Sequence, residues 1–437
     1  MGKFLEVREF EYITCNKDYK EDSSFKYLDK DVFEELEKFI LSYKDNGEAE
    51  AVDFLKIGSM RNVGKYIQAK NYVGLIQMKN GFQVQVIPKI SFIDECNTKK
   101  IFLRMLRSMN DFPSKVFNES GLKVDKMNLY EIFINMYIQE IRNIVKKGIK
   151  SAYLPKESNE CFYKGKLVVK EQLRKNLVHK ERFYVSYDEF GVNRPENRLI
   201  KSSLLKLLNI STNTENVKDI RQLLINFEMV KPSNNYIKDF SRVVIDRNTK
   251  LYEIAMRWSK VFLMNQSFTT FTGNVTARAL LFPMEKVFES YVAKYLKKAL
   301  LGVDCELSLQ DKGFYLFDSP RQFALRPDIV ITRSDDSKII LDTKWKSLVN
   351  NPRQNYGISQ GDMYQMYAYS KKYDTSEIWL LYPITEEMQN HTSDLQFLSN
   401  DNVKVRIFFI DVANIKSSLE KLKVLLNLDK DVNLIGV

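Results

Sequence analysis

One acidic residue ends an otherwise apolar run in the last third of the chain, and it restricts how that segment can fold. The run 339–341 is Ile-Ile-Leu and is followed directly by Asp342. A carboxylate beside a buried strand is costly unless it is paired or bound to a metal. A second apolar run, 329–332, lies before the run 339–341 in the chain, and the polar turn formers 333–337 stand between the two runs. The pattern predicts a β-hairpin with charge at its open end.

Three charged side chains are expected to meet at that open end. If the turn is centred between residues 335 and 336, Asp328 lies beside Asp342 and Thr343. Asp342 and Lys344 are two residues apart, so they point to the same face of one strand. Two carboxylates and an ammonium suit a divalent metal and a phosphate, because Mg²⁺ prefers carboxylate and water oxygens. The alternative is a surface hairpin with scattered charge.

Two predicted helices carry further candidate residues. In the helix predicted over 361–372, Gln365 and Tyr369 are four residues apart and share a face. Their amide and phenol could bind phosphate or orient water, although ordinary packing aromatics are an equal alternative. In the helix predicted over 283–300, Glu289 stands between apolar neighbours. It is our preferred third carboxylate for a metal, with a solvated helix charge as the alternative.

Composition excludes several other kinds of site. The chain has 437 residues and a net charge of +11, which favours two or three domains and a polyanionic partner. It has only two histidines and four widely spaced cysteines, so a zinc site or a His-based triad is disfavoured. No apolar run is long enough for a membrane span and the N-terminus lacks a secretory pattern, so we expect a cytoplasmic protein.

The apolar periodicity predicts an α+β chain with several domains. Residues 1–100 are expected to be rich in strands and residues 101–272 mainly helical, and both are expected to bind a partner. A polar stretch at 265–274 marks the expected boundary. Residues 273–437 are predicted to form an α/β domain, a mixed sheet flanked by helices. The elements predicted in this domain are strands near 303–309, 314–317, 323–332, 338–345, 377–382 and 403–411, and helices over 283–300, 361–372 and 415–426.

The motif Pro327-Asp328, followed by Asp342-Thr343-Lys344, resembles the active site of the PD-(D/E)xK nuclease superfamily. Gln365 with Tyr369 resembles the additional helix motif of its RecB-like branch. Other segments are similar, in the same order, to the McrC family, the endonuclease subunits of McrBC modification-dependent (type IV) restriction systems. They are 72–76, 87–90, 165–167, 176–183, 188–190 and 193–198.

This resemblance implies a C-terminal nuclease domain that cuts double-stranded DNA with Mg²⁺. Carried over residue by residue, the active site is Asp328, Asp342 and Lys344, with Gln365 as a weaker match. The implied partner is an McrB-like AAA+ GTPase hexamer, which reads the methylated base and whose pore receives the N-terminal region of McrC. The absence of a P-loop or G-x-G-x-x-G motif agrees with nucleotide hydrolysis by a partner.

Two other functions are compatible with the sequence. The chain could be a stand-alone PD-(D/E)xK nuclease of DNA repair, or a non-catalytic subunit that only stimulates the GTPase ring. A local ambiguity concerns Arg194 and Arg198, four residues apart at the start of a predicted helix. They could reach a nucleotide phosphate or a carboxylate of the ring, or they could hold a structural turn.

Overall fold

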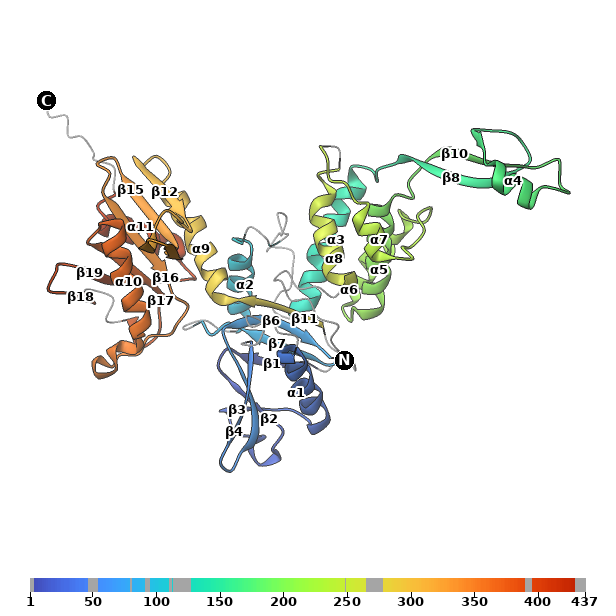
Figure 1. Cartoon of the computed structure of the whole chain (residues 1–437). Helices are drawn as coiled ribbons and strands as arrows, with labels where there is room; N and C mark the ends of the chain where they lie inside the picture. The colour runs from blue at the N-terminus through green and yellow to red at the C-terminus, as the bar shows by residue number, and fades with distance from the viewer. Residues whose placement is uncertain are drawn as a thin grey trace. The chain divides into compact units, whose positions relative to one another are not determined.

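The structure is a computed structural model. It describes residues 4–45, 54–78, 81–90, 95–109, 112, 127–247, 249–264, 278–389 and 395–428. Its contacts divide the chain into a smaller unit within 113–272 and a larger unit formed by 3–112 and 273–437 (Figure 1). The polar stretch predicted to mark a boundary at 265–274 lies outside the described residues. None of the described helices has the length and apolar character that crossing a membrane requires.

A six-stranded mixed sheet forms the centre of the C-terminal part of the larger unit. Its strands, in spatial order, are β12 (Cys305–Leu309), β15 (Ile329–Arg333), β16 (Lys338–Thr343), β17 (Glu377–Pro383), β19 (Lys404–Ile410) and β18 (Gln396–Leu398). β15 is antiparallel to both β12 and β16, whereas β16, β17 and β19 run parallel. The parallel strands are nearly continuous buried apolar runs, as expected for strands covered on both faces.

Helices cover this sheet. α10 (Gln360–Tyr373) buries Met366, Tyr369 and Tyr373 in a core cluster with the central strands. α9 (Met284–Ala299) and α11 (Ile415–Leu425) pack against each other, and the Tyr291 hydroxyl donates a hydrogen bond to the Val412 carbonyl over 3.1 Å. The other elements of this part are β13 (Tyr315–Asp318), β14 (Arg321–Ala324) and the 3-10 segment η5 (Pro352–Gly357).

Two four-stranded sheets precede this domain in the same unit. One has the order β1 (Phe4–Arg8), β7 (Gln83–Ile87), β6 (Tyr72–Gln77) and β11 (Arg278–Pro283). The other has the order β3 (Phe25–Tyr27), β2 (Tyr12–Thr14), β5 (Gly64–Ala69) and β4 (Leu55–Met60). The remaining elements are η1 (Lys17–Tyr19), α1 (Lys30–Asp45) and α2 (Glu95–Leu106). Because β11 pairs with β6, a strand that follows the smaller unit completes a sheet that precedes it.

The smaller unit combines a helical bundle with a long hairpin. The helices are α3 (Leu129–Lys146), α5 (Pro195–Ile210), α6 (Thr214–Ile225), α7 (Tyr236–Ser241) and α8 (Tyr252–Met264). The hairpin pairs β8 (Ala152–Glu160) with β10 (Phe183–Gly191), and it carries β9 (Lys166–Leu167) and α4 (Val169–Lys175). Figure 1 shows it running out from the helices of this unit, with α4 near its far end. The region thus combines five described helices of a bundle with the strands of the hairpin.

Most elements predicted for the C-terminal part are confirmed within a few residues, but four details differ. The hairpin turns about Asp335, because Thr332 pairs with Lys338. The predicted strand 323–332 is divided into β14 and β15, and β11 and β18 were not predicted. Pro283 is the N-cap of α9 and also ends β11.

Gly74 allows β11 to approach β6 closely, and its replacement tests this junction. Gly74 has φ +143°, and a Cβ atom there would lie 1.9 Å from the Leu280 carbonyl oxygen. We expect Gly74→Ala to lower the free energy of unfolding by about 2–4 kcal/mol, measured by urea denaturation. Gly64 is the control, because it also has positive φ but open space around it. An equal loss for Gly64→Ala would contradict the role of close packing.

Candidate active site

The hairpin β15–β16 places two acidic residues side by side. Ile329 pairs with Leu341, so Asp328 and Asp342 are the next residues outward. The Asp328 Oδ2 atom accepts hydrogen bonds from the Thr343 backbone N–H at 2.8 Å and from its hydroxyl at 2.6 Å. Asp342 is only 1% exposed. The predicted convergence of Asp328 with Asp342 and Thr343 is confirmed.

Lys344 connects this acidic pair to helix α10. Its Nζ atom lies 2.5 Å from Asp342 Oδ2 and donates a hydrogen bond of 3.2 Å to Gln365 Oε1. The amide nitrogen of Gln365 in turn donates to the hydroxyl of the buried Tyr369 over 2.6 Å. The side chains from the predicted hairpin and the predicted helix thus form one continuous chain of polar contacts. Tyr369 stands at its end and acts on the site through Gln365.

Glu289 of α9 approaches the same site through an intermediary. The Gln310 side-chain amide donates to Glu289 Oε1 and lies 3.5 Å from Asp328 Oδ1. The Gln310 backbone N–H also donates to the Asp328 carbonyl over 2.9 Å. Glu289 therefore faces the acidic pair across one amide group. Within the described part of the chain, no three Asp, Glu, His or Cys side chains lie close enough to hold a metal ion together.

Burial and repulsion between like charges make ionisation of these carboxylates unfavourable. Burial, with a further contribution from the charge of Asp328, raises the pKa of Asp342 to about 7 although Lys344 opposes the shift. The same two causes raise the pKa of Glu289 to about 7. Burial also raises the pKa of Asp328 against its hydrogen bonds from Thr343. A divalent cation would relieve this repulsion, so the donor set of Asp328 and Asp342 fits one.

Lys344 remains a cation in this setting. Burial alone lowers the pKa of its ammonium group, but the charges of Asp342 and Asp328 outweigh burial and raise the pKa above its ordinary value. The group is therefore suited to stabilise negative charge rather than to accept a proton.

Several residues that support the site were not predicted from the sequence. Gln310 directly follows the strand predicted at 303–309, and no sequence pattern distinguishes it. Lys346 forms an ion pair of 2.8 Å with Asp362 at the start of α10, where Ser359 caps the helix. One sequence signal could have indicated a further partner, because Trp345 directly follows Lys344 and a buried indole N–H needs an acceptor. In the structure, Trp345 is 4% exposed.

That acceptor is Glu9, which follows β1. Its two carboxylate oxygens each lie 3.1 Å from Trp345 Nε1, and Oε2 accepts the Lys89 backbone N–H over 3.0 Å. Burial raises the pKa of Glu9 to about 8, despite these hydrogen bonds. The contact joins the N-terminal sheets to the segment that carries Lys344.

The segments that resemble the McrC middle region lie on the hairpin of the smaller unit and at the start of α5. The buried Asn176 donates to Asn159 Oδ1 at 2.7 Å and to the Arg182 carbonyl at 3.2 Å. Arg194 pairs with Glu196 at 3.1 Å. Arg198 pairs with Asp239, a side chain of α7, at 2.6 Å. These contacts support the structural alternative for both arginines.

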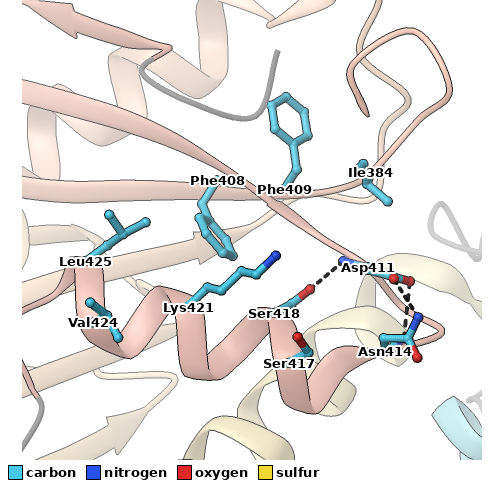
Figure 2. A pocket seen from close by; sticks show the side chains of 10 residues that line it. All are labelled: Ile384, Phe408, Phe409, Asp411, Asn414, Ser417, Ser418, Lys421, Val424 and Leu425. Carbon is cyan, nitrogen blue, oxygen red and sulfur yellow. Dashed lines mark hydrogen bonds between the residues drawn. The ribbon is translucent and has the colours of Figure 1, made fainter. Parts of the chain in front are cut away.

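A separate pocket of about 750 Å³ lies between β19 and α11. Figure 2 shows Phe408 and Lys421 beside it and the hydrogen bond between Ser418 and Asp411. The backbone N–H of Asp411 donates to the Ser418 hydroxyl over 3.0 Å. None of the predicted site residues lines this pocket, so we do not assign the candidate chemistry to it.

The raised pKa of Glu289 predicts a pH-dependent cost in stability. Its pKa of about 7 in the folded state exceeds the ordinary value of 4.5. Ionisation therefore costs no stability below about pH 4.5, increasingly more up to about pH 7, and its full amount above that. In metal-free buffer at pH 8, we expect Glu289→Gln to raise the free energy of unfolding by roughly 1–2 kcal/mol, allowing for solvent screening.

This gain should shrink as the pH falls towards 4.5, as measured by urea denaturation across that range. The control is Glu306→Gln, at an exposed position of β12. A gain in unfolding free energy for Glu289→Gln that does not change with pH would argue against an unfavourable ionised carboxylate at this position.

Comparisons with known proteins agree with this architecture. The family model "McrBC 5-methylcytosine restriction system component" matches residues 67–383. A refined half-complex from a tetradecameric assembly of Thermococcus gammatolerans McrB AAA+ hexamers with bound McrC contains a chain with a TM-score of 0.73 and 19% identity. The match covers 97% of this chain and 99% of that one. At that identity, the likeness establishes the fold alone.

A further match is to the T. gammatolerans McrBC complex, solved by cryo-electron microscopy. It has a TM-score of 0.47 and 22% identity and covers 68% of this chain and 88% of that one. No curated protein matches the chain. Because the family model covers well over half of the sequence, the chain belongs to the family of McrBC 5-methylcytosine restriction system components.

Proposed function

We propose that this chain is the Mg²⁺-dependent DNA endonuclease subunit of a modification-dependent restriction system. The observation that carries the proposal is the convergence of Asp328, Asp342 and Lys344 at the end of one hairpin. Membership of the McrBC family supports the same conclusion. The net charge of +11 is consistent with a polyanionic substrate.

Asp328 and Asp342 would hold the metal, with Glu289 as a further carboxylate on the other side of Gln310. When bound, Mg²⁺ lowers the pKa of a coordinated water and neutralises charge on a phosphate. Lys344, as a cation between Asp342 and Gln365, stabilises the negative charge that develops on the phosphate oxygens. Gln365 accepts a hydrogen bond from the ammonium group and so holds it in place. Tyr369 positions Gln365, because its hydroxyl accepts a hydrogen bond from the Gln365 amide.

Substitution of the two central residues tests the catalytic assignment. We expect Asp342→Ala and Lys344→Ala each to reduce Mg²⁺-dependent cleavage of a methylated plasmid by at least about 100-fold, in the presence of the cognate AAA+ partner and GTP. Matched surface controls are Glu306→Ala and Lys312→Ala, both at exposed positions.

Three outcomes separate the possible functions. Cleavage by Asp342→Ala at the wild-type rate would overturn the active site. Metal-dependent cleavage that needs neither partner nor GTP would favour a stand-alone repair nuclease. Absence of cleavage by the wild-type protein, with stimulation of the partner's GTPase retained, would favour a purely regulatory subunit.

We further propose that the partner is an McrB-like AAA+ GTPase ring that recognises methylated DNA. The similar solved structure is described as McrC bound to McrB AAA+ hexamers. The β8–β10 hairpin of this chain offers a surface for such a contact, because Phe162, Tyr163, Leu177 and Val178 are 58%, 59%, 70% and 84% exposed. Exposed apolar side chains grouped on one projection are typical of a protein interface.

The contact can be tested at the end of this hairpin. We expect Leu177→Asp combined with Val178→Asp to reduce stimulation of the partner's GTPase by at least about tenfold, because buried charge weakens an apolar interface. The control is Met229→Asp, which is 82% exposed in the same unit but lies outside the hairpin. Stimulation that survives the double substitution would place the contact elsewhere, and circular dichroism would verify that both variants are folded.

A further inference from the structure

Five of the twelve residues that line a large open pocket in the larger unit are lysines. Its volume is about 1110 Å³. The residues that give it charge come from both N-terminal sheets, from α9 and from the segment after β16. They are Lys56, Lys70, Lys89, Lys286 and Lys346, with Glu285 as the one acidic member. Five lysines against one glutamate make this surface, here called the lysine groove, a strongly cationic part of the unit.

The lysine groove adjoins the candidate active site. Lys346 lies two residues beyond Lys344 and forms its ion pair with Asp362 on α10, the helix that also carries Gln365. Glu285 lies one helical turn before Glu289, and its charge is close enough to raise the pKa of Asp328 further. The groove and the carboxylates therefore share two elements of structure.

The walls of the groove are joined by hydrogen bonds that side chains make between different elements. Glu9 accepts hydrogen bonds from Trp345, beside Lys346, and from the backbone N–H of Lys89. Asn71, between Lys70 and β6, donates from its side chain to Glu285 Oε1 over 3.2 Å. These contacts hold lysines from distant parts of the sequence around one space.

An aromatic side chain stands in the same groove at a strained position. Phe10 has φ +68° and is 37% exposed. Its backbone is held there by hydrogen bonds with the Ala69 carbonyl and the Gln68 side chain. Strained non-glycine residues are found preferentially at functional sites, and an exposed ring among cations suits contact with sugars and bases.

We propose that the lysine groove binds the DNA phosphates that flank the phosphate being cut. The inference rests on the proposed nuclease function, since the groove shares α9 and the segment after β16 with that site. Its charge favours a polyanion, and its position beside a phosphodiesterase site favours DNA over an acidic protein. In this arrangement the N-terminal sheets form part of the substrate-binding surface.

The test measures DNA binding without cleavage. The full-length chain binds a short fluorescently labelled duplex in buffer containing EDTA, and anisotropy gives the affinity over a series of salt concentrations. The variant is Lys56→Ala/Lys70→Ala/Lys89→Ala. We expect a weaker affinity, by about tenfold or more at low salt, and a log–log salt dependence that is shallower by about 2–3.

Two further proteins make the result specific. Lys17→Ala/Lys20→Ala/Lys30→Ala removes the same charge from exposed positions outside the groove and should bind like the wild type. The Lys→Arg triple variant at positions 56, 70 and 89 keeps the charge and should also bind like the wild type. A groove variant that binds as tightly as this control, or a control that loses as much affinity, would overturn the proposal.

The outcome can be separated from a failure of the nuclease assignment. Cleavage that depends on Asp342, together with undiminished binding by the groove variant, would remove the groove proposal and leave the proposed function intact. Cleavage that is indifferent to Asp342→Ala would remove the proposed function and, with it, the basis for placing flanking phosphates in the groove.

Discussion

The hydrogen bonds from Thr343 to the Asp328 carboxylate are the constraint on which the site depends. They fix the open end of the β15–β16 hairpin, where Asp328 and Asp342 lie side by side. The fold thereby keeps two like charges together in a largely buried place, an arrangement that costs stability unless a cation offsets it. Lys344 supplies part of that offset from within the chain.

The polar contacts around this pair form a chain that runs outward from the carboxylates. Lys344 touches Asp342 directly, Gln365 holds Lys344, and Tyr369 holds Gln365. On the other side, Gln310 separates Glu289 from Asp328. α9 thus contributes Glu289 and α10 contributes Gln365 to a site whose central charges lie at the ends of the β15–β16 hairpin.

The larger unit depends on an interleaved chain path. β11 returns from the smaller unit to complete a sheet that begins near the N-terminus, and Glu9 contacts Trp345 across more than three hundred residues of sequence. The N-terminal sheets are therefore built onto the domain that carries the carboxylates, and the lysine groove is a consequence of that path. The smaller unit, by contrast, carries a hairpin with exposed apolar side chains, and the hydrogen bond from Asn176 to Asn159 joins its segments.

The hairpin, its charged end and most elements of the C-terminal part follow from the amino-acid sequence, because apolar periodicity and turn residues act over a few positions. Asp328, Asp342, Lys344, Gln365 and Tyr369 could be chosen on that basis. Four contacts emerge only in the folded chain: Gln310 bridges Glu289 to Asp328, Glu9 accepts the hydrogen bond of the Trp345 indole, Arg198 pairs with Asp239, and β11 pairs with β6. Each of these contacts joins residues far apart in the chain, and local periodicity carries no information about such partners.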